Sequence, residues 1–272
     1  MTPLDNCVIY QIYPMSFQDS NGDGMGDING ICQRLDYLAE LGVDMLWLTP
    51  VYCSPKRDNG YDVADYRHID PAFGTLADME QLIAKAAERG MGIMMDIVAN
   101  HTSTEHEWFV RALAGDARYQ AYYVFRDKAF VDTHPVQSIF GGNGWQYVPA
   151  LDSYYLHNFD VSQADLDWDN PAVRAEMAEV INFWLTKGIK GFRFDVIDMV
   201  SKEWSPLAMS NGPRLHDYIR ELNQTSFGNK GIITVGETWG ADLAHMQHYS
   251  NPNGSEFSMV FNFEHLGLGQ DK

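Results

Sequence analysis

Two carboxylic acids follow short apolar segments and have the chemistry of a catalytic pair. Asp195 ends segment 191–195, and Glu237 directly follows segment 232–236. An acid at the end of a buried strand is unfavourable unless it is paired or used. Arg193 would share a strand face with Asp195, so its charge should lower the pKa of Asp195 and keep that nucleophile ionised. An acid held protonated by its neighbours can instead donate a proton.

Two such carboxyls about 5 Å apart are typical of a retaining glycosidase. For each acid taken alone, a structural ion pair is the alternative interpretation. His101, which follows Asn100 after another apolar segment, has two similar interpretations. In the functional interpretation, His101 acts as a general base or as a hydrogen-bond donor to a substrate. In the structural interpretation, it is a histidine that only stabilises the end of a strand.

A second motif, residues 19–27, carries an oxygen ligand at every second position, with glycines between. The spacing matches the first nine positions of an EF-hand loop, although Gly30 stands where the twelfth-position glutamate is expected. Three aspartates this close would repel one another without a cation, so we predict a structural Ca²⁺. An ordinary Asp/Asn/Gly turn is the alternative. The predicted ligands are Asp19, Asn21, Asp23, the Met25 carbonyl and Asp27.

Short apolar segments alternate with amphipathic helical patterns along the chain, which predicts a parallel α/β sheet. Expected strands are 7–13, 45–49, 91–98, 191–197, 232–237 and 257–263, and helices are expected near 31–41, 79–90, 171–188 and 213–222. Polar residues gather where strands end, as at the carboxyl-terminal face of a (β/α)8 TIM barrel. A doubly wound nucleotide-binding fold is the rival, but its Gly-rich turn after the first strand is missing.

Between residues 101 and 168 the βα alternation stops, and the chain becomes rich in Tyr, Gly, Asp and His. We therefore expect three segments: 1–100 as the first part of the barrel, 101–168 as a subdomain inserted after the third strand, and 169–272 as the continued barrel. About six strands are expected, against the eight that closure requires. We expect the chain to hold the N-terminal portion of such a barrel.

The formal net charge of −18 disfavours binding to nucleic acid or to an anionic membrane. The 13% aromatic residues suit either sugar platforms or a large core. The three cysteines show neither disulfide nor zinc spacing, which favours the cytoplasm. Neither a signal peptide nor an apolar segment long enough to span a membrane is expected.

Three segments together resemble signatures of the α-amylase family, glycoside hydrolase family 13. They are 96–101, 191–195 and 236–239, and they occur in the family's order at the expected strand ends. Segments 9–14, 58–62, 163–168 and the 19–27 loop resemble the oligo-1,6-glucosidase branch. The likeness extends over essentially the whole chain. It implies a retaining α-glucosidase that hydrolyses α-1,6 bonds of isomalto-oligosaccharides or dextran fragments from the nonreducing end, without an organic cofactor.

The resemblance also implies roles for single residues. Asp195 is the nucleophile, Glu237 the general acid/base, and Arg193 orients Asp195. Asp58 and His101 would hold hydroxyl groups of the nonreducing glucose, and Tyr61 would stack on its ring. Trp239 would line the next subsite. In this branch, valine after the nucleophile, here Val196, resembles the α-1,6 preference, whereas alanine or threonine accompanies α-1,4.

The family has a third acid in an Asn-His-Asp segment after the seventh strand, and this chain contains no such segment. We therefore expect the 272-residue chain alone to be a poor enzyme or an inactive fragment that needs a C-terminal half. Its exposed barrel edges are expected to favour self-association. Trehalose-6-phosphate hydrolase, sucrose isomerase and α-1,4-glucosidase remain alternatives within the family. A non-catalytic transporter heavy chain is disfavoured, because such chains have lost the catalytic acids.

Overall fold

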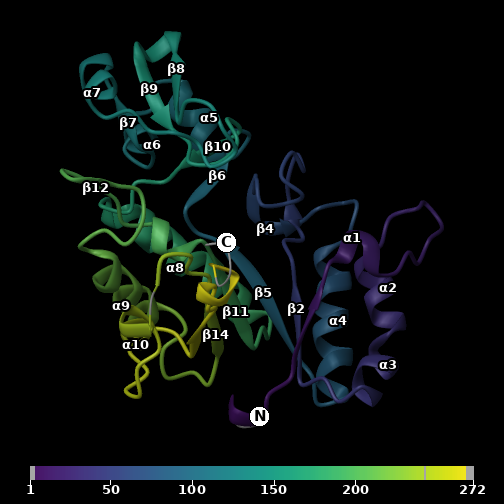
Figure 1. Cartoon of the computed structure of the whole chain (residues 1–272). Coiled ribbons are helices and arrows are strands. Elements are labelled where there is room, and N and C mark those ends of the chain that lie inside the picture. Colours follow the sequence, from purple (N-terminus) through teal and green to yellow (C-terminus); the bar gives the residue numbers. More distant parts are fainter. Residues whose placement is uncertain (1–3, 242, 268–272) are drawn as a thin grey trace.

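The computed structural model describes residues 4–241 and 243–267, and its centre is a parallel sheet of six strands (Figure 1). Met1 and Lys272, the outer limits of the predicted segments, lie outside the described residues. The strands neighbour one another in chain order, as in a barrel, and the order does not reverse as it would in a doubly wound sheet. They are β1 (Ile9–Ile12), β2 (Met45–Leu48), β5 (Gly92–Val98), β11 (Gly191–Asp195), β14 (Ile233–Gly236) and β15 (Met259–Val260). The predicted N-terminal portion of a (β/α)8 barrel is confirmed.

The central strands are apolar because both of their faces are covered. Every residue of β11 is buried, and so is every residue of β5 except Gly92. Figure 1 shows helices flanking the sheet, with α2–α4 near β1 and β2 and α8–α10 near β11 and β14. These helices are α2 (Ile28–Gln33), α3 (Leu35–Glu40), α4 (Leu76–Glu88), α8 (Pro171–Thr186), α9 (Leu215–Thr225) and α10 (Leu243–Tyr249).

Local signals explain where the long helices begin. In α4, Thr75 and Asp78 form a reciprocal capping box. In α8, the Asn170 side chain accepts a hydrogen bond from the Ala172 amide, and Pro171 occupies the first turn, where its missing N–H is harmless. Trp184 is the last buried residue of α8, and its indole N–H donates to the carbonyl of Tyr66, 2.8 Å away.

The chain between β5 and α8 leaves the sheet and forms two small antiparallel sheets, β7-β9-β8 and β10-β6. Figure 1 shows most of this segment beyond the ends of the central strands. The domain boundaries at residues 100/101 and 168/169 stay predictions. The segment contains β6 (His101–Ser103), α5 (Glu107–Leu113), α6 (Ala117–Gln120), β7 (Phe125–Arg126), α7 (Lys128–Thr133), β8 (Trp145–Val148), η2 (Pro149–Leu151), β9 (Ser153–Leu156) and β10 (Gln163–Asp165).

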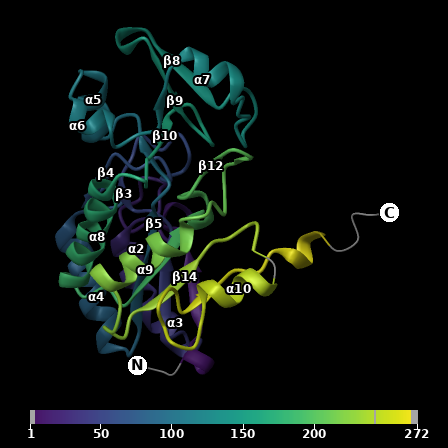
Figure 2. The ribbon, with the colours of Figure 1, turned by 90° about the vertical axis from the view of Figure 1, so that its left-hand side faces the viewer.

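Shorter elements connect these parts or lie beside the sheet. They are η1 (Leu4–Asn6), α1 (Pro14–Phe17), β3 (Tyr52–Cys53), β4 (Asp65–Ile69), η3 (Ile197–Met199), β12 (Glu203–Trp204), β13 (Leu207–Ala208) and η4 (Glu264–Gly267). Figure 2 shows that the chain after β15 runs away from the rest of the molecule through η4.

Several expected boundaries are wrong. The helix expected at 31–41 is divided into α2 and α3, because Arg34 leaves helical geometry, with ψ near 4°. The helix expected at 213–222 begins at Leu215 and continues to Thr225. The fourth strand ends at Asp195 because Val196 adopts a left-handed conformation. The strand expected at 257–263 has two residues, Met259 and Val260.

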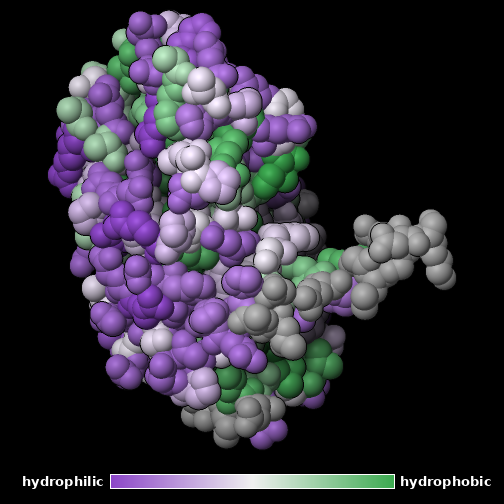
Figure 3. Space-filling model, turned by 60° about the vertical axis from the view of Figure 1, so that its left-hand side comes forward, coloured by the Kyte–Doolittle hydropathy of each residue, from purple (hydrophilic) through white to green (hydrophobic). Residues whose placement is uncertain are grey.

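The surface agrees with the acidic, polar composition of the chain. Figure 3 shows hydrophilic residues over most of one face, with hydrophobic residues gathered near its margin. Within residues 4–241 and 243–267, no helix has the length and apolar character needed to span a membrane. In the same residues, β1 and β15 form the two edges of the six-stranded sheet, while self-association through these edges stays a prediction.

Candidate active site

All eight residues that the sequence assigned to catalysis or substrate binding line one cavity of about 640 Å³. It lies at the carboxyl-terminal ends of β11 and β14, the expected face of a barrel. Apolar side chains from the segment between β5 and α8, Ile139, Phe140 and Phe159, complete one wall. The eight residues are Asp58, Tyr61, His101, Arg193, Asp195, Val196, Glu237 and Trp239.

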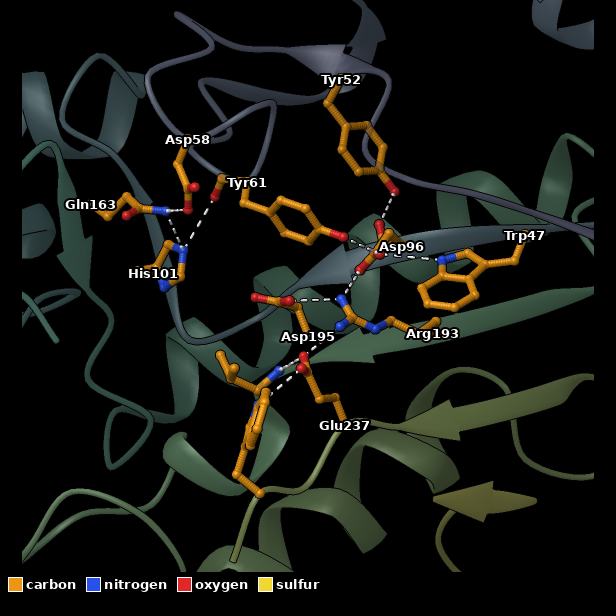
Figure 4. A network of polar contacts seen from close by, with 12 residues as sticks. Trp47, Tyr52, Asp58, Tyr61, Asp96, His101, Gln163, Arg193, Asp195 and Glu237 are labelled. Carbon is orange, nitrogen blue, oxygen red and sulfur yellow. Dashed lines mark hydrogen bonds and ion pairs between the residues drawn. The ribbon is translucent and has the colours of Figure 1, made fainter. Parts of the chain in front are cut away.

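The Arg193 guanidinium lies at the centre of the site (Figure 4). Its Nη1 donates to Asp96 Oδ1 at 2.8 Å and to Asp195 Oδ1 at 2.6 Å, and its Nη2 donates to Glu237 Oε2. The rings of Trp47 and Tyr61 lie 5.3 and 5.8 Å from the guanidinium carbon. The β-sheet register explains the convergence, since Arg193 on β11 pairs with Asp96 on β5 and with Val235, two residues before Glu237.

Asp96 is the buried partner that holds this arrangement on the β5 side. Its Oδ2 accepts hydrogen bonds from Trp47 Nε1 and from the Tyr61 hydroxyl, both at 3.2 Å. The Tyr52 hydroxyl donates to its backbone carbonyl at 2.8 Å. With its carboxylate oxygens already occupied by Arg193, Trp47 and Tyr61, Asp96 is a structural anchor for Arg193.

Burial shifts the pKa values of the acids upward. It raises the pKa of Asp195 to about 6, although Arg193 acts in the opposite direction. The expected net lowering by Arg193 is therefore wrong, because desolvation outweighs the guanidinium. Burial also raises the pKa of Glu237, again opposed by Arg193. Three carboxylates around one guanidinium leave two uncompensated negative charges, so retention of a proton on one acid is favoured.

The turn after β11 brings Asp195 and Glu237 together. Val196 has φ 36°, a left-handed conformation that a β-branched residue rarely adopts. This turn points the Val196 amide at Glu237 Oε2, 3.1 Å away. The other carboxylate oxygen of Glu237 accepts a hydrogen bond from Trp239 Nε1 at 2.9 Å. Trp239 itself is 60% exposed and stacks on Phe263 with ring centroids 4.3 Å apart.

A second polar group lines the opposite side of the cavity (Figure 4). Gln163 Nε2 donates to Asp58 Oδ2 at 2.8 Å and lies 3.1 Å from His101 Nε2. That histidine nitrogen also lies 3.2 Å from the Tyr61 carbonyl. Burial lowers the pKa of His101, so its ring is neutral near pH 7. A neutral ring suits a hydrogen-bonding role, and the pairing of β10 with β6 brings Gln163 to this position.

The buried ammonium group of Lys202 supports His101 indirectly, through Asn100. Lys202 Nζ lies 3.0 Å from Asp165 Oδ2, 3.0 Å from Asn100 Oδ1 and 2.8 Å from the Met199 carbonyl. Asn100 Nδ2 in turn lies 3.2 Å from His101 Nδ1. The sequence interpretation gave no role to Lys202 or Gln163, although Gln163 begins the 163–168 segment that resembles the oligo-1,6-glucosidase branch. Nothing in its local spacing identifies Lys202. Asp96 did carry a signal, since it is an acid inside an apolar strand.

The 19–27 loop is folded by its own hydrogen bonds. Asp19 accepts hydrogen bonds from the amides of Asn21, Gly22 and Gly24 at 2.7–2.9 Å, and these bonds lower its pKa. Asp27 Oδ1 caps α2 through the Gly30 amide. Among residues 4–241 and 243–267, no three His, Cys, Asp or Glu side chains are gathered as metal ligands. The turn interpretation accounts for these contacts, and calcium stays a prediction.

The sheet order and the paired acids at adjacent strand ends are those of a (β/α)8-barrel glycoside hydrolase domain. The chain belongs to the α-amylase family, glycoside hydrolase family 13, because the α-amylase catalytic domain matches residues 11–272. It is 52% identical to glucan 1,6-alpha-glucosidase of Streptococcus pneumoniae over 97% of this chain and 49% of that protein. It is 47% identical to trehalose-6-phosphate hydrolase of Escherichia coli, over 96% and 49%.

Solved structures give the same relationship. The crystal structure of Bacillus licheniformis trehalose-6-phosphate hydrolase matches with a TM-score of 0.91 at 44% identity, covering 96% of this chain and 49% of that one. The chain thus spans about half the length of the relatives that it matches.

We predict that Arg193→Met lowers the free energy of unfolding by about 3–5 kcal/mol at pH 7, because three buried carboxylates lose their cation. The carboxyl pKa values in the folded variant lie above their unfolded values. The deficit should therefore shrink as the pH falls toward about 4 and grow as it rises. Urea unfolding at several pH values measures this.

The matched control is Arg214→Met, which removes an exposed ion pair with Asp169. It should change the free energy of unfolding by about 1 kcal/mol or less. Equal losses in the two variants, without a pH dependence for Arg193→Met, would contradict the central role of the buried guanidinium.

Proposed function

We propose that the full-length protein is a retaining α-glucosidase that cleaves α-1,6 bonds of isomalto-oligosaccharides or dextran fragments from the nonreducing end. The observation that carries the proposal is the contact of Asp195 and Glu237 with neighbouring nitrogens of one guanidinium, inside one cavity. This closeness fits the carboxyl separation of about 5–5.5 Å in retaining enzymes better than the about 6.5–9.5 Å of inverting ones. The separation itself stays a prediction.

The proposed reaction has two displacements. Asp195 Oδ attacks the anomeric carbon while the bond to the glycosidic oxygen breaks, and Glu237 gives its proton to that leaving oxygen. A water molecule then attacks the same carbon, transfers a proton to Glu237 and releases Asp195 as a carboxylate. The raised pKa of Glu237 suits proton donation, and the Arg193 guanidinium suits stabilisation of the Asp195 carboxylate.

The surrounding residues fit the recognition of a neutral sugar. The adjacent Asp58 and His101 offer polar atoms to hydroxyl groups, Tyr61 offers a ring, and the exposed Trp239 suits the next sugar. Arg193 is the only Lys or Arg among the described residues that line the cavity, and three carboxylates already bind it. This favours an uncharged substrate over trehalose 6-phosphate, which serves as a comparison substrate in the assay.

We predict that the full-length protein hydrolyses isomaltose with retention. With p-nitrophenyl α-glucoside, whose leaving group is not a sugar, NMR should therefore detect α-glucose first. Asp195→Asn and Glu237→Gln should each lower kcat by at least about 10³-fold, since both groups form bonds in the transition state. Gln33→Ala, an exposed change in α2, is the control. Initial release of β-glucose from the aryl glucoside would contradict the mechanism, and turnover of trehalose 6-phosphate faster than that of isomaltose would contradict the proposed substrate.

We predict that kcat/KM for isomaltose declines below about pH 6. The pKa of Asp195 in the folded protein is about 6, so the nucleophile is increasingly protonated, and thus inactive, as the pH falls through this value. The decline should approach about tenfold per pH unit. A profile that remains flat to pH 4.5 would show that the group titrates elsewhere or is not the nucleophile.

We predict that Val196→Thr shifts the ratio of isomaltose to maltose turnover toward maltose by about 10–200-fold, the effect of a small change in a pocket. Both side chains are β-branched, so the left-handed backbone at Val196 should be retained. The control Val200→Thr adds the same hydroxyl at a buried position outside the cavity wall. An unchanged ratio in Val196→Thr would remove this side chain as the linkage determinant.

We also propose that Ca²⁺ stabilises the 19–27 loop, supported by its alternating oxygens and intervening glycines. At a calcium concentration about 100 times the Kd, the free energy of unfolding should rise by about 2.7 kcal/mol. Asp23→Ala, at an exposed position, should abolish the response. Equal unfolding curves in calcium and in chelator would contradict the proposal.

The three free cysteines support a reducing, cytoplasmic location.

A further inference from the structure

The turns that follow Asp195 and Glu237 are fastened together by another acid, Asp198. Asp198 Oδ2 accepts hydrogen bonds from the amides of Trp239 at 3.0 Å and Gly240 at 3.3 Å. In the opposite direction, the Ile197 amide donates to the Glu237 carbonyl at 3.1 Å. The left-handed conformation of Val196 turns the chain so that Asp198 faces the Glu237 turn. The two turns are therefore joined independently of the Arg193 cluster.

Asp198 lies in the wall of the active-site cavity, and its side chain is almost completely buried there. The residue is 1% exposed, and its Oδ1 is buried without a hydrogen-bond partner. An acid in such a place is unfavourable unless it has a task. Burial raises its pKa to about 6, and two backbone amides act in the opposite direction. The contacts of Asp198 indicate that its task is to fix the backbone at residues 239 and 240.

That backbone determines the position of the proton donor. Trp239 Nε1 donates to Glu237 Oε1 at 2.9 Å, while Trp239 is 60% exposed and has few neighbours to hold its ring. The stack on Phe263 restrains the ring from one side. The hydrogen bond from the Trp239 amide to Asp198 restrains the backbone that carries the ring. Loss of Asp198 would free the turn, loosen the indole and release one oxygen of Glu237.

We propose that Asp198 is a positioning residue for proton donation by Glu237, acting through the Trp239 turn. The inference rests on the proposed glucosidase function and adds a determinant of its first displacement. It requires no contact between Asp198 and substrate. If the Glu237 carboxyl is no longer held in place, cleavage should slow most for substrates whose leaving oxygen needs a proton. It should slow least for substrates whose leaving group departs as a stable anion.

The test is the ratio of kcat/KM for isomaltose to kcat/KM for p-nitrophenyl α-glucoside in the full-length protein. Both values report steps up to the first displacement, but p-nitrophenolate leaves without protonation. Asp198→Ala should lower the value for isomaltose by about 10²-fold, the size expected for a misplaced catalytic group. The value for the aryl glucoside should stay within about threefold of wild type.

Two variants separate positioning from general damage. Asp198→Asn keeps an oxygen for both amides and should restore the ratio to within about threefold of wild type. Glu256→Gln removes a buried carboxylate that pairs with His216 and Arg220 outside the cavity, so it should lower stability without changing the ratio. If Asp198→Ala does not fold, Asp198→Leu, similar in shape to aspartate, takes its place.

The outcomes are distinct. Equal loss on both substrates in Asp198→Ala, or a ratio in Asp198→Asn as low as in Asp198→Ala, would overturn the positioning role. A wild-type ratio in Asp198→Ala would overturn it as well. A wild-type protein that hydrolyses neither substrate would instead overturn the proposed function on which this inference rests.

Discussion

The buried ion cluster of Arg193 is the interaction on which the site depends. One guanidinium binds Asp96, Asp195 and Glu237, which come from the ends or the interior of three neighbouring strands. Removal of one partner from such a cluster would leave charge without compensation in a poorly solvated place. The cluster therefore constrains the register of β5, β11 and β14, and the same contacts that stabilise these strands bring two acids together.

Negative charge exceeds positive charge in this cluster, and that imbalance has chemical consequences. Burial raises the pKa values of Asp195 and Glu237, while the shared cation limits the increase. An excess of buried carboxylates favours one protonated and one ionised acid, the combination that a double displacement needs. In the proposed reaction the fold thus prepares the proton donor before substrate binds. The rings of Trp47 and Tyr61 beside Arg193 keep water away from the guanidinium.

The segment between β5 and α8 completes the cavity from the other side. It supplies His101 and Gln163 through the β6–β10 pair, and the buried Lys202 after β11 connects that pair to the sheet. In a similar way, Asp198 connects the turn after β11 to the turn after β14. Both connections join loops to rigid strands, because side chains on loops keep a defined position only when their backbone is held.

The sequence by itself determined the type and order of the strands, since apolar segments followed by polar ends are a local pattern. It also predicted Asp195, Glu237 and His101 as site residues, because strand-end acids and family segments are readable in order, and the structure places all three in one cavity. Tertiary structure alone decided that burial outweighs Arg193 in the pKa of Asp195. It also decided that Gln163, Lys202 and Asp198 support the site, and that the fourth strand stops at Asp195. These features depend on desolvation and on contacts between residues far apart in the chain, which no local spacing encodes.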